Sequence, residues 1–242
     1  MSFPRINIED YSYDLPPDRI AQYPLPERDA SRLLCSIDGN ITEDSFRNIA
    51  RYITPGSMMV FNNTRVIRAR LIFQKSTGTH IEIFCLEPLE PTPEINKAFQ
   101  QKETVTWRCL IGNAKRWKSG VLEMPVEISG RKFNLQASRI KETEDGTFSI
   151  AFSWHPSGIS FGEVLEGAGR IPLPPYISRE EGPADTLRYQ TIYAQEEGSV
   201  AAPTAGLHFT PAVMETLRSK DILREQVTLH VGLGTFKPVN SP

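Results

Sequence analysis

Short apolar runs separated by turn residues fill the middle of the chain, between residues 74 and 153. Runs rich in β-branched and aromatic residues are typical of strands, and Ser129-Gly130 and Asp145-Gly146 carry hairpin signals. The predicted strands are Thr79 to Leu86, Thr104 to Ile111, Val121 to Ile128, Lys132 to Glu142 and Thr147 to Trp154. Several antiparallel strands in succession predict a small barrel or sandwich, inserted into a larger domain.

Helical spacing appears on both sides of this region. Phe46, Ile49 and Ile53 share one face of a predicted amphipathic helix from Thr42 to Ile53. Other helices are predicted at Ile159 to Ala168 and at Pro211 to Lys220, the latter with Thr210 as its N-cap. Further strands are predicted at Leu33 to Ile37, on both sides of Asn62-Asn63, and at Gln226 to Val231. The chain is therefore predicted to have an α/β (α+β) fold: a discontinuous large domain with a barrel-like mixed sheet (1–73 and 154–242) and an inserted all-β barrel domain (74–153).

Three proline-rich segments interrupt the regular pattern. Residues 10–34 are predicted to lie extended across a core, because closely spaced prolines prevent long regular elements. Residues 88–103 combine prolines with charges and are predicted to form a solvated loop. In GRIPLPPYISR, from Gly169 to Arg179, the prolines should hold Leu173 and Tyr176 in an extended wall. Such a wall serves either as core cladding or as the side of a pocket.

Small side chains dominate the segment between Tyr193 and Thr210. Glycine, serine, alanine and threonine leave the backbone bare over most of Gly198 to Gly206, and bare backbone can approach a ligand closely. Pro203 stiffens the middle of the segment, and a predicted helix N-terminus follows it. The pattern predicts a ligand-approach loop without specifying its chemistry.

Bulk composition limits the classes of function. The formal net charge is −2 at pH 7, so a nucleic-acid partner would have to be met by a local basic patch. The three cysteines, Cys35, Cys85 and Cys109, lack metal-ligand spacing and are expected to be reduced, buried packing residues. The N-terminus has no secretory pattern and no run reaches membrane-spanning length, so a cytoplasmic location without membrane contact is expected.

Cationic residues gather at two places. Lys115, Arg116 and Lys118 surround Trp117 in one predicted turn, where charge could grip phosphate while the ring stacks on a base. A solvated hairpin tip with Trp117 folded back onto the sheet is an equally good interpretation. Arginines 65, 68 and 70 alternate along a predicted strand, where they pair with phosphates or are simply solvated.

Two of the four histidines stand beside small-residue turns: His208 and His230. A lone histidine is usually structural, and His80 and His155 are interpreted so. Neither a glycine-rich nucleotide-binding motif nor a zinc-ligand spacing occurs in the sequence, so dinucleotide and metal chemistry are not expected.

Four segments together carry a resemblance to a known family. IAQYPLPERDASRLL, GRIPLPPYISR with the small-residue loop, and VTLHVGLGTFKPV follow one another in the order found in the S-adenosylmethionine:tRNA ribosyltransferase-isomerases of queuosine biosynthesis. The resemblance implies transfer and isomerisation of the ribosyl part of S-adenosylmethionine onto 7-aminomethyl-7-deazaguanine at the tRNA wobble position. Epoxyqueuosine would form, with release of adenine and methionine. S-adenosylmethionine is then the co-substrate and tRNA the partner, while no oligomeric state follows.

The resemblance also implies roles for individual residues. His208, with His230 as the second choice, would move protons, since histidine titrates near neutrality. The S-adenosylmethionine pocket would be lined by Gly198, Ser199, Ala202, Pro203, Thr204, Ala205 and Gly206. The tRNA would be met by Arg28, Arg32, Arg65, Arg68, Lys115, Arg116 and Lys118. Without the resemblance, the cluster around Arg28 and Asp29 would be interpreted as a surface turn with a local ion pair.

Members of this family typically continue beyond the VTLHVGLGTFKPV run. The chain is therefore expected to be a truncated form or a shortened relative. The alternative function is a non-catalytic tRNA- or nucleoside-binding protein, and an unrelated structural α/β protein is the third possibility.

Overall fold

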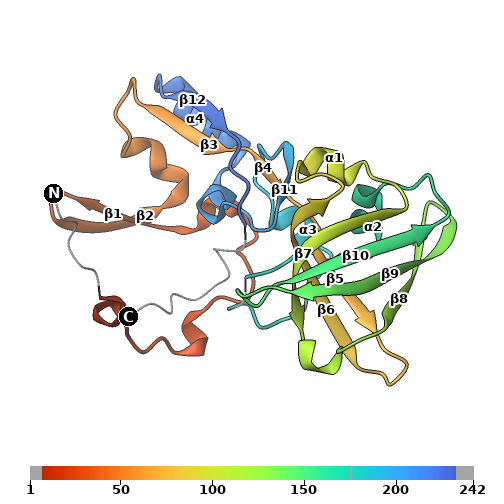
Figure 1. Ribbon diagram of the computed structural model, residues 1–242. Coiled ribbons are helices and arrows are strands. Elements are labelled where there is room, and N and C mark those ends of the chain that lie inside the picture. Colours follow the sequence, from red (N-terminus) through yellow and green to blue (C-terminus); the bar gives the residue numbers. More distant parts are fainter. Residues whose placement is uncertain (1–6, 175, 233–242) are drawn as a thin grey trace, which may run out of the picture.

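The computed structural model describes residues 7–174 and 176–232 (Figure 1). Its largest feature is a six-stranded antiparallel sheet with the order β5-β6-β7-β10-β9-β8. The edge strands β5 and β8 lie against each other, so the sheet curls into a nearly closed barrel. The strands are β5 Arg70–Gln74, β6 His80–Glu90, β7 Thr104–Gly112, β8 Val121–Ile128, β9 Arg131–Glu142 and β10 Phe148–His155. The predicted strands of the middle region are confirmed.

Alternation along the strands explains why this region closes on itself. In β7, Val105, Trp107 and Cys109 are buried while their neighbours are at least partly exposed, as expected of a strand with one face on a core. The β8–β9 connection is the predicted hairpin, because Ser129 and Gly130 both have positive φ, 50° and 76°. Such turns match the twist of the flanking strands.

Two short helices, α1 Ile95–Phe99 and α2 Phe161–Ala168, pack beside the barrel (Figure 1). Phe161 is fully buried, with its ring centroid 5.4 to 5.6 Å from those of Trp107, Phe152 and Trp154. The prediction of a solvated loop over residues 88–103 was wrong. Strand β6 continues to Glu90, and α1 buries Ala98 and Phe99 against the barrel.

Outside the barrel, the described strands form three pairs (Figure 1). The hairpin of β1 (Arg32–Ile37) and β2 (Asn40–Ser45) is antiparallel. The other two pairs are parallel: β3 (Met58–Asn62) with β12 (Leu223–Val227), and β4 (Thr64–Val66) with β11 (Glu196–Ser199). A separate apolar cluster supports this region through Phe46, Phe61, Tyr193, Phe209, Val213 and Leu217. Together with the barrel, these pairs confirm a mixed α/β fold.

The helices of this region are short. They are the 3-10 turns η1 Ile8–Tyr11, η2 Pro17–Arg19, η3 Arg28–Ala30, η4 Phe46–Arg51 and η6 Thr204–His208, and the α-helices α3 Asp185–Arg188 and α4 Pro211–Ser219; the barrel carries η5 Ala114–Arg116. Helix α4 starts as predicted, with the Thr210 hydroxyl accepting a hydrogen bond from the backbone N–H of Val213.

Two predicted boundaries were wrong. The helix expected from Thr42 to Ile53 is only η4, because Thr42 and Asp44 pair with Cys35 and Leu33 in the β1–β2 hairpin. The last strand lies at 223–227 rather than 226–231, because its register against β3 places Leu223 beside Met58 and Val227 beside Asn62. In both cases strand pairing overrode the local pattern, within a hairpin in the first case and with a strand about 165 residues away in the second.

Several other expectations concern the whole chain. All three cysteines are free and buried, as predicted. Within residues 7–174 and 176–232 there is no helix long and apolar enough to cross a bilayer. In the same ranges no three histidine, cysteine or acidic side chains gather as a metal ion would require. The division into two domains at residues 74 and 153 stays a prediction.

Candidate functional site

A cavity of about 510 Å³ lies where three distant segments meet. Its first wall is the segment 21–32, its second is residues 173–174 and 176–179 with α3, and its third is η6. Small-molecule sites typically occupy about 300–1,000 Å³ and are mostly apolar with a few polar groups. The lining includes Leu173, Pro174, Tyr176, Ile177 and Tyr189, so the extended wall predicted from the prolines is the side of a pocket.

Arginine side chains hold the first wall against the second. Arg179 donates from Nε to the carbonyl of Gln22 at 2.7 Å, and its guanidinium lies 4.5 Å from the centre of the Tyr23 ring. Arg188 donates to the carbonyl oxygens of Leu25 and Pro26. The cavity is thus closed by hydrogen bonds between segments about 160 residues apart, 157 of them separating Gln22 from Arg179.

An ion pair between Arg179 and Asp185 lies in the lining of the cavity. Arg179 donates two hydrogen bonds to the buried carboxylate of Asp185, at 2.6 and 2.8 Å, and the backbone N–H of Gly182 adds a third at 2.7 Å. The hydrogen bonds from Arg179 hold the pKa of Asp185 below its usual value, and those to Asp185 raise the pKa of Arg179. Burial raises the pKa of Tyr189 to about 12, so this lining phenol is neutral at physiological pH.

His208 lines the cavity from η6 and is half-buried. Its ring packs against Phe46, with 5.3 Å between ring centroids and an interplanar angle of 44°. Thr204, at the other end of the same turn, is exposed and also lines the cavity. The structure therefore brings the predicted catalytic histidine and one predicted S-adenosylmethionine contact into the same space.

The other predicted S-adenosylmethionine residues do not line this cavity. Gly198, Ser199 and Ala202 are buried, Pro203 is half-buried, and Ala205 is exposed outside it. A Cβ added to Gly206 would come within 2.3 Å of the Tyr193 hydroxyl oxygen, and one added to Gly198 within 2.5 Å of Ile95. At these two glycines the bare backbone serves close packing, because the neighbouring side chains occupy the space.

His230 is not among the residues that line the cavity with His208. Its ring stands beside Gly198, where an added Cβ would be 3.1 Å from Cε1 and Nδ1. The adjacent Val231 donates its N–H to the hydroxyl of Ser199 at 3.1 Å. The remainder of the VTLHVGLGTFKPV run, from residue 233, lies outside the described residues.

The predicted tRNA contacts are distributed over three places. Arg28 and Arg32 line the cavity, and Arg65 and Arg68 line another of about 750 Å³, where they pair with Glu197 and Glu166. The third group, Lys115, Arg116 and Lys118, is exposed around η5. Trp117 beside it is fully buried and donates to the carbonyl of Gly120 at 3.1 Å, so its ring packs in the barrel and is not available for stacking on a base.

Arg28 differs from the other cationic residues in its surroundings. It is half-buried, and its two terminal nitrogens donate to the carbonyl oxygens of Leu207, at 3.0 Å, and Leu187, at 2.8 Å. Burial, with a smaller contribution from Arg188, lowers the pKa of its guanidinium. Its hydrogen-bonding groups are therefore directed into the protein.

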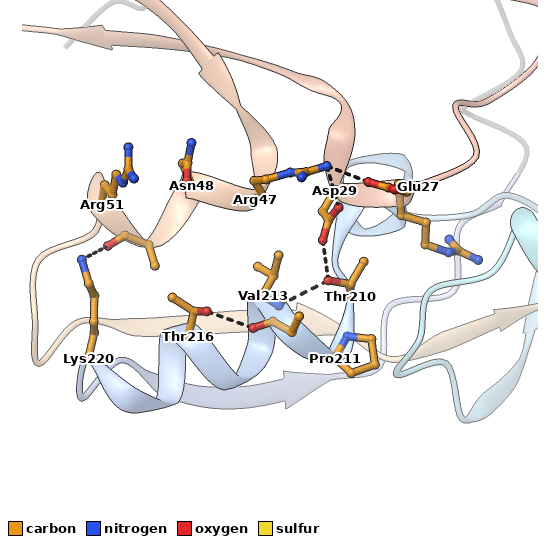
Figure 2. A pocket seen from close by; sticks show the side chains of 13 residues that line it. Glu27, Asp29, Arg47, Asn48, Arg51, Thr210, Pro211, Val213, Thr216 and Lys220 are labelled. Atoms are coloured by element: carbon orange, nitrogen blue, oxygen red, sulfur yellow. Dashed lines mark hydrogen bonds and ion pairs between the residues drawn. The ribbon is translucent and has the colours of Figure 1, made fainter.

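A second cavity, of about 860 Å³, lies on the other side of η3, between η4 and α4 (Figure 2). Glu27 and Arg28 line both cavities. In Figure 2, Asp29 stands between Arg47 and Thr210: its carboxylate accepts from the Thr210 hydroxyl at 2.9 Å and lies 3.6 Å from the Arg47 guanidinium. Sequence reasoning placed Asp29 only in a signature run, and this contact across 181 residues had no local signal.

The fold and the first cavity define a mixed α/β protein that carries a barrel and a cavity of small-molecule size, lined in part by His208. The chain belongs to the family described as "Queuosine biosynthesis protein", whose model matches residues 8–242. This agrees with the family resemblance of its sequence motifs.

Several similar proteins align with nearly the whole of this chain. The S-adenosylmethionine:tRNA ribosyltransferase-isomerase of Geobacter metallireducens is 39% identical over 97% of the chain and 63% of its own length. The proteins of the same name from Azoarcus sp. and Thermotoga maritima are 41% identical over 97% of the chain and 61% and 62% of theirs. A crystal structure of S-adenosylmethionine tRNA ribosyltransferase from Thermotoga maritima aligns with 92% of the chain and 58% of its own, at 29% identity and a TM-score of 0.33. The chain thus spans about 63% of the relatives it matches.

Proposed function

We propose that the chain acts in queuosine biosynthesis by transferring and isomerising the ribosyl part of S-adenosylmethionine onto 7-aminomethyl-7-deazaguanine in tRNA, with release of adenine and methionine. Family membership and the names of the relatives support this reaction. The observation that carries it is the cavity in which His208 and Thr204 face the wall of Leu173 and Tyr176. A tRNA substrate implies a cytoplasmic location.

The cavity has features that suit each part of this substrate. Apolar and aromatic walls can hold the adenine and ribose, and Tyr23 and Tyr176 supply exposed rings. In this proposal His208 moves a proton, either to the adenine ring as it leaves or from the carbon next to sulfur. No metal is needed for these steps, because proton transfer and a good leaving group suffice.

The tRNA is proposed to approach across exposed cationic residues. Arg32 lies at the rim of the cavity, while Arg65, Lys115, Arg116 and Lys118 are exposed elsewhere on the surface. Because these contacts would go to phosphates, binding should weaken steeply as salt is raised. Arg28 does not fit this role, since its donors are already engaged by backbone carbonyls.

The test is adenine release from S-adenosylmethionine in the presence of precursor-containing tRNA, measured by chromatography. We expect His208→Ala to lower the rate by roughly 10²- to 10⁴-fold, the usual contribution of a general acid or base. His80→Ala is the matched control, because His80 is an exposed histidine at the start of β6 in the barrel. Turnover that is the same in both variants would remove His208 from the reaction.

The second candidate is nucleoside or tRNA binding without turnover. It is favoured by the burial of Gly198, Ser199 and Ala202, which leaves less exposed backbone for S-adenosylmethionine than the sequence suggests. Calorimetry separates the two candidates. Heat of S-adenosylmethionine binding with no adenine release supports binding alone, whereas release in proportion to enzyme supports the transferase.

A further inference from the structure

Two consecutive residues of η3, Arg28 and Asp29, hold the turn that carries His208. Arg28 donates from Nη1 to the carbonyl of Leu207 at 3.0 Å, directly before His208. Asp29 accepts from the hydroxyl of Thr210 at 2.9 Å, two residues after it. The histidine is therefore bracketed on both sides by hydrogen bonds from one short turn.

These two residues are anchored in turn. Arg28 donates from Nη2 to the carbonyl of Leu187 in α3 at 2.8 Å. The second carboxylate oxygen of Asp29 lies 3.6 Å from the Arg47 guanidinium (Figure 2). The backbone carbonyl of Asp29 accepts from the Ser45 hydroxyl at 3.1 Å. The Asp29 side chain is only 17% exposed, so water competes little for its bonds. Arg28 is thus hydrogen-bonded to α3, and Asp29 contacts the junction between β2 and η4.

The hydrogen bonds within η6 alone hold the position of His208 only weakly. η6 is a 3-10 helix without a side-chain N-cap, and hydrogen-bond geometry in 3-10 turns is poorer than in α-helices. Thr210 is also the N-cap of α4, accepting from Val213 at 3.2 Å. One hydroxyl therefore links the start of α4 to Asp29, just beyond the histidine.

Asp29 lies on the far side of this link from the histidine's cavity. It lines the cavity of Figure 2 and does not line the one that contains His208. Its influence on His208 must therefore pass through Thr210 rather than through contact with a bound molecule. Arg28 lines both cavities, but its nitrogens point to carbonyl oxygens.

We propose that Arg28 and Asp29 are positioning residues that hold His208 against Phe46 at the edge of its cavity. This inference rests on the proposed function only for the reaction that His208 serves. Asp29 is the better residue to test, because it does not line the cavity that contains His208.

The experiment compares Asp29→Ala, Asp29→Asn and a matched control, Asp145→Ala, in the whole chain. In the barrel, Asp145 accepts from the hydroxyls of Thr143 and Thr147 at 2.6 and 2.8 Å, which makes it an Asp–Thr contact of the same kind. The first measurement is the nuclear Overhauser effect between the rings of His208 and Phe46 in the free protein. We expect Asp29→Ala to lose it, while Asp145→Ala keeps it.

Asp29→Asn distinguishes the hydrogen bond to Thr210 from the negative charge of the carboxylate. Its amide oxygen can still accept from the Thr210 hydroxyl, so Asp29→Asn should retain the ring contact. The second measurement is turnover: Asp29→Ala should lower kcat for adenine release by about 10- to 100-fold, as expected for a displaced catalytic group, with KM for S-adenosylmethionine nearly unchanged. Asp29→Asn should recover most of kcat.

Three results would overturn the inference: an intact ring contact in Asp29→Ala, an equal loss in Asp145→Ala, or an Asn variant as impaired as the Ala variant. Unchanged kcat in Asp29→Ala would overturn it as well. A wild-type chain that neither binds S-adenosylmethionine nor releases adenine contradicts the proposed function instead. The ring measurement needs no substrate, so it still decides the positioning role in that case.

Discussion

The barrel and the region around the cavity are held together in different ways. In the barrel, six strands form a continuous hydrogen-bonded ladder around large, fully buried side chains such as Trp107 and Phe152. Around the cavity, the segment 21–32 is held mainly by guanidinium groups that donate to backbone carbonyls. Stability in the first region is spread over many apolar contacts, whereas in the second it depends on a few polar ones. Single substitutions should therefore act very differently in the two regions.

The largest effect is expected from Phe161→Ala in the barrel core. Removing a fully buried ring that contacts three other aromatic rings should lower the free energy of unfolding by about 3–5 kcal/mol. Urea denaturation followed by tryptophan fluorescence measures it. Ile140→Ala, at a position that is 57% exposed, is the control and should change stability by no more than about 0.5 kcal/mol. Equal effects of the two variants would contradict a core-stabilised barrel.

A smaller, local effect is expected from Asp185→Asn in the lining of the cavity. Breaking its buried pair with Arg179 should lower the opening free energy of residues 173–189 by about 3 kcal/mol and leave the barrel amides unchanged. Hydrogen exchange resolved by residue measures both. Glu215→Gln, which removes the exposed partner of Arg218, should change neither region. Loss of protection in the barrel as well would show that the two regions do not open independently.

The same pair predicts a pH dependence. The pKa of Asp185 is lowered in the folded protein, so the unfolded state binds the proton more readily and the stabilisation is present above its unfolded pKa of about 3.9. It is lost as pH falls through the folded pKa. The difference between wild type and Asp185→Asn should therefore be constant near neutrality and should shrink below about pH 4.

The smallest effect is expected from Ser160→Ala at the start of α2. The hydroxyl accepts from Glu163 N–H, and the Glu163 carboxylate accepts from the Ser160 backbone N–H at 2.8 Å. Losing this capping box should cost about 1 kcal/mol, which is about 2–4 °C in Tm for a chain of this size. Calorimetry measures it, and Ser160→Thr should retain the wild-type Tm because it keeps the capping hydroxyl.

The same contrast explains what could be predicted from the sequence. Strand alternation and the Ser129-Gly130 turn are local signals, and they located five of the six barrel strands, β6 to β10, to within a few residues, whereas β5 was predicted as part of a strand outside the barrel. Helix α1 was missed because Phe99 is buried by distant partners, among them Trp107 at 5.7 Å between ring centroids, whereas the proline and charge content of the segment suggested a solvated loop. The helical spacing of Phe46, Ile49 and Ile53 was extended too far back, because residues 40–45 pair with β1 across the Asp38-Gly39 turn, where both residues have positive φ.

The candidate site was only partly predictable. The histidine and Thr204 were found through a family resemblance, and the prolines of 172–175 suggested a wall without deciding what it encloses. The side chains that close the cavity could not be found, because Arg179 and Gln22 have no common local pattern. The glycines 198 and 206 were interpreted as ligand contacts, since a sequence does not show that Ile95 and Tyr193 already fill the space beside them.

The close packing at Gly198 mechanically couples β11 to the barrel. Gly198 is wedged between Ile95 of α1 and the ring of His230, with no spare volume for even a methyl group. Because β11 contacts α1 at this point, a displacement of β11 towards α1 would be passed to Phe99, which stacks on Trp107 at 17° between ring planes. The intrinsic fluorescence of Trp107 would then report ligand binding near β11 without an added label.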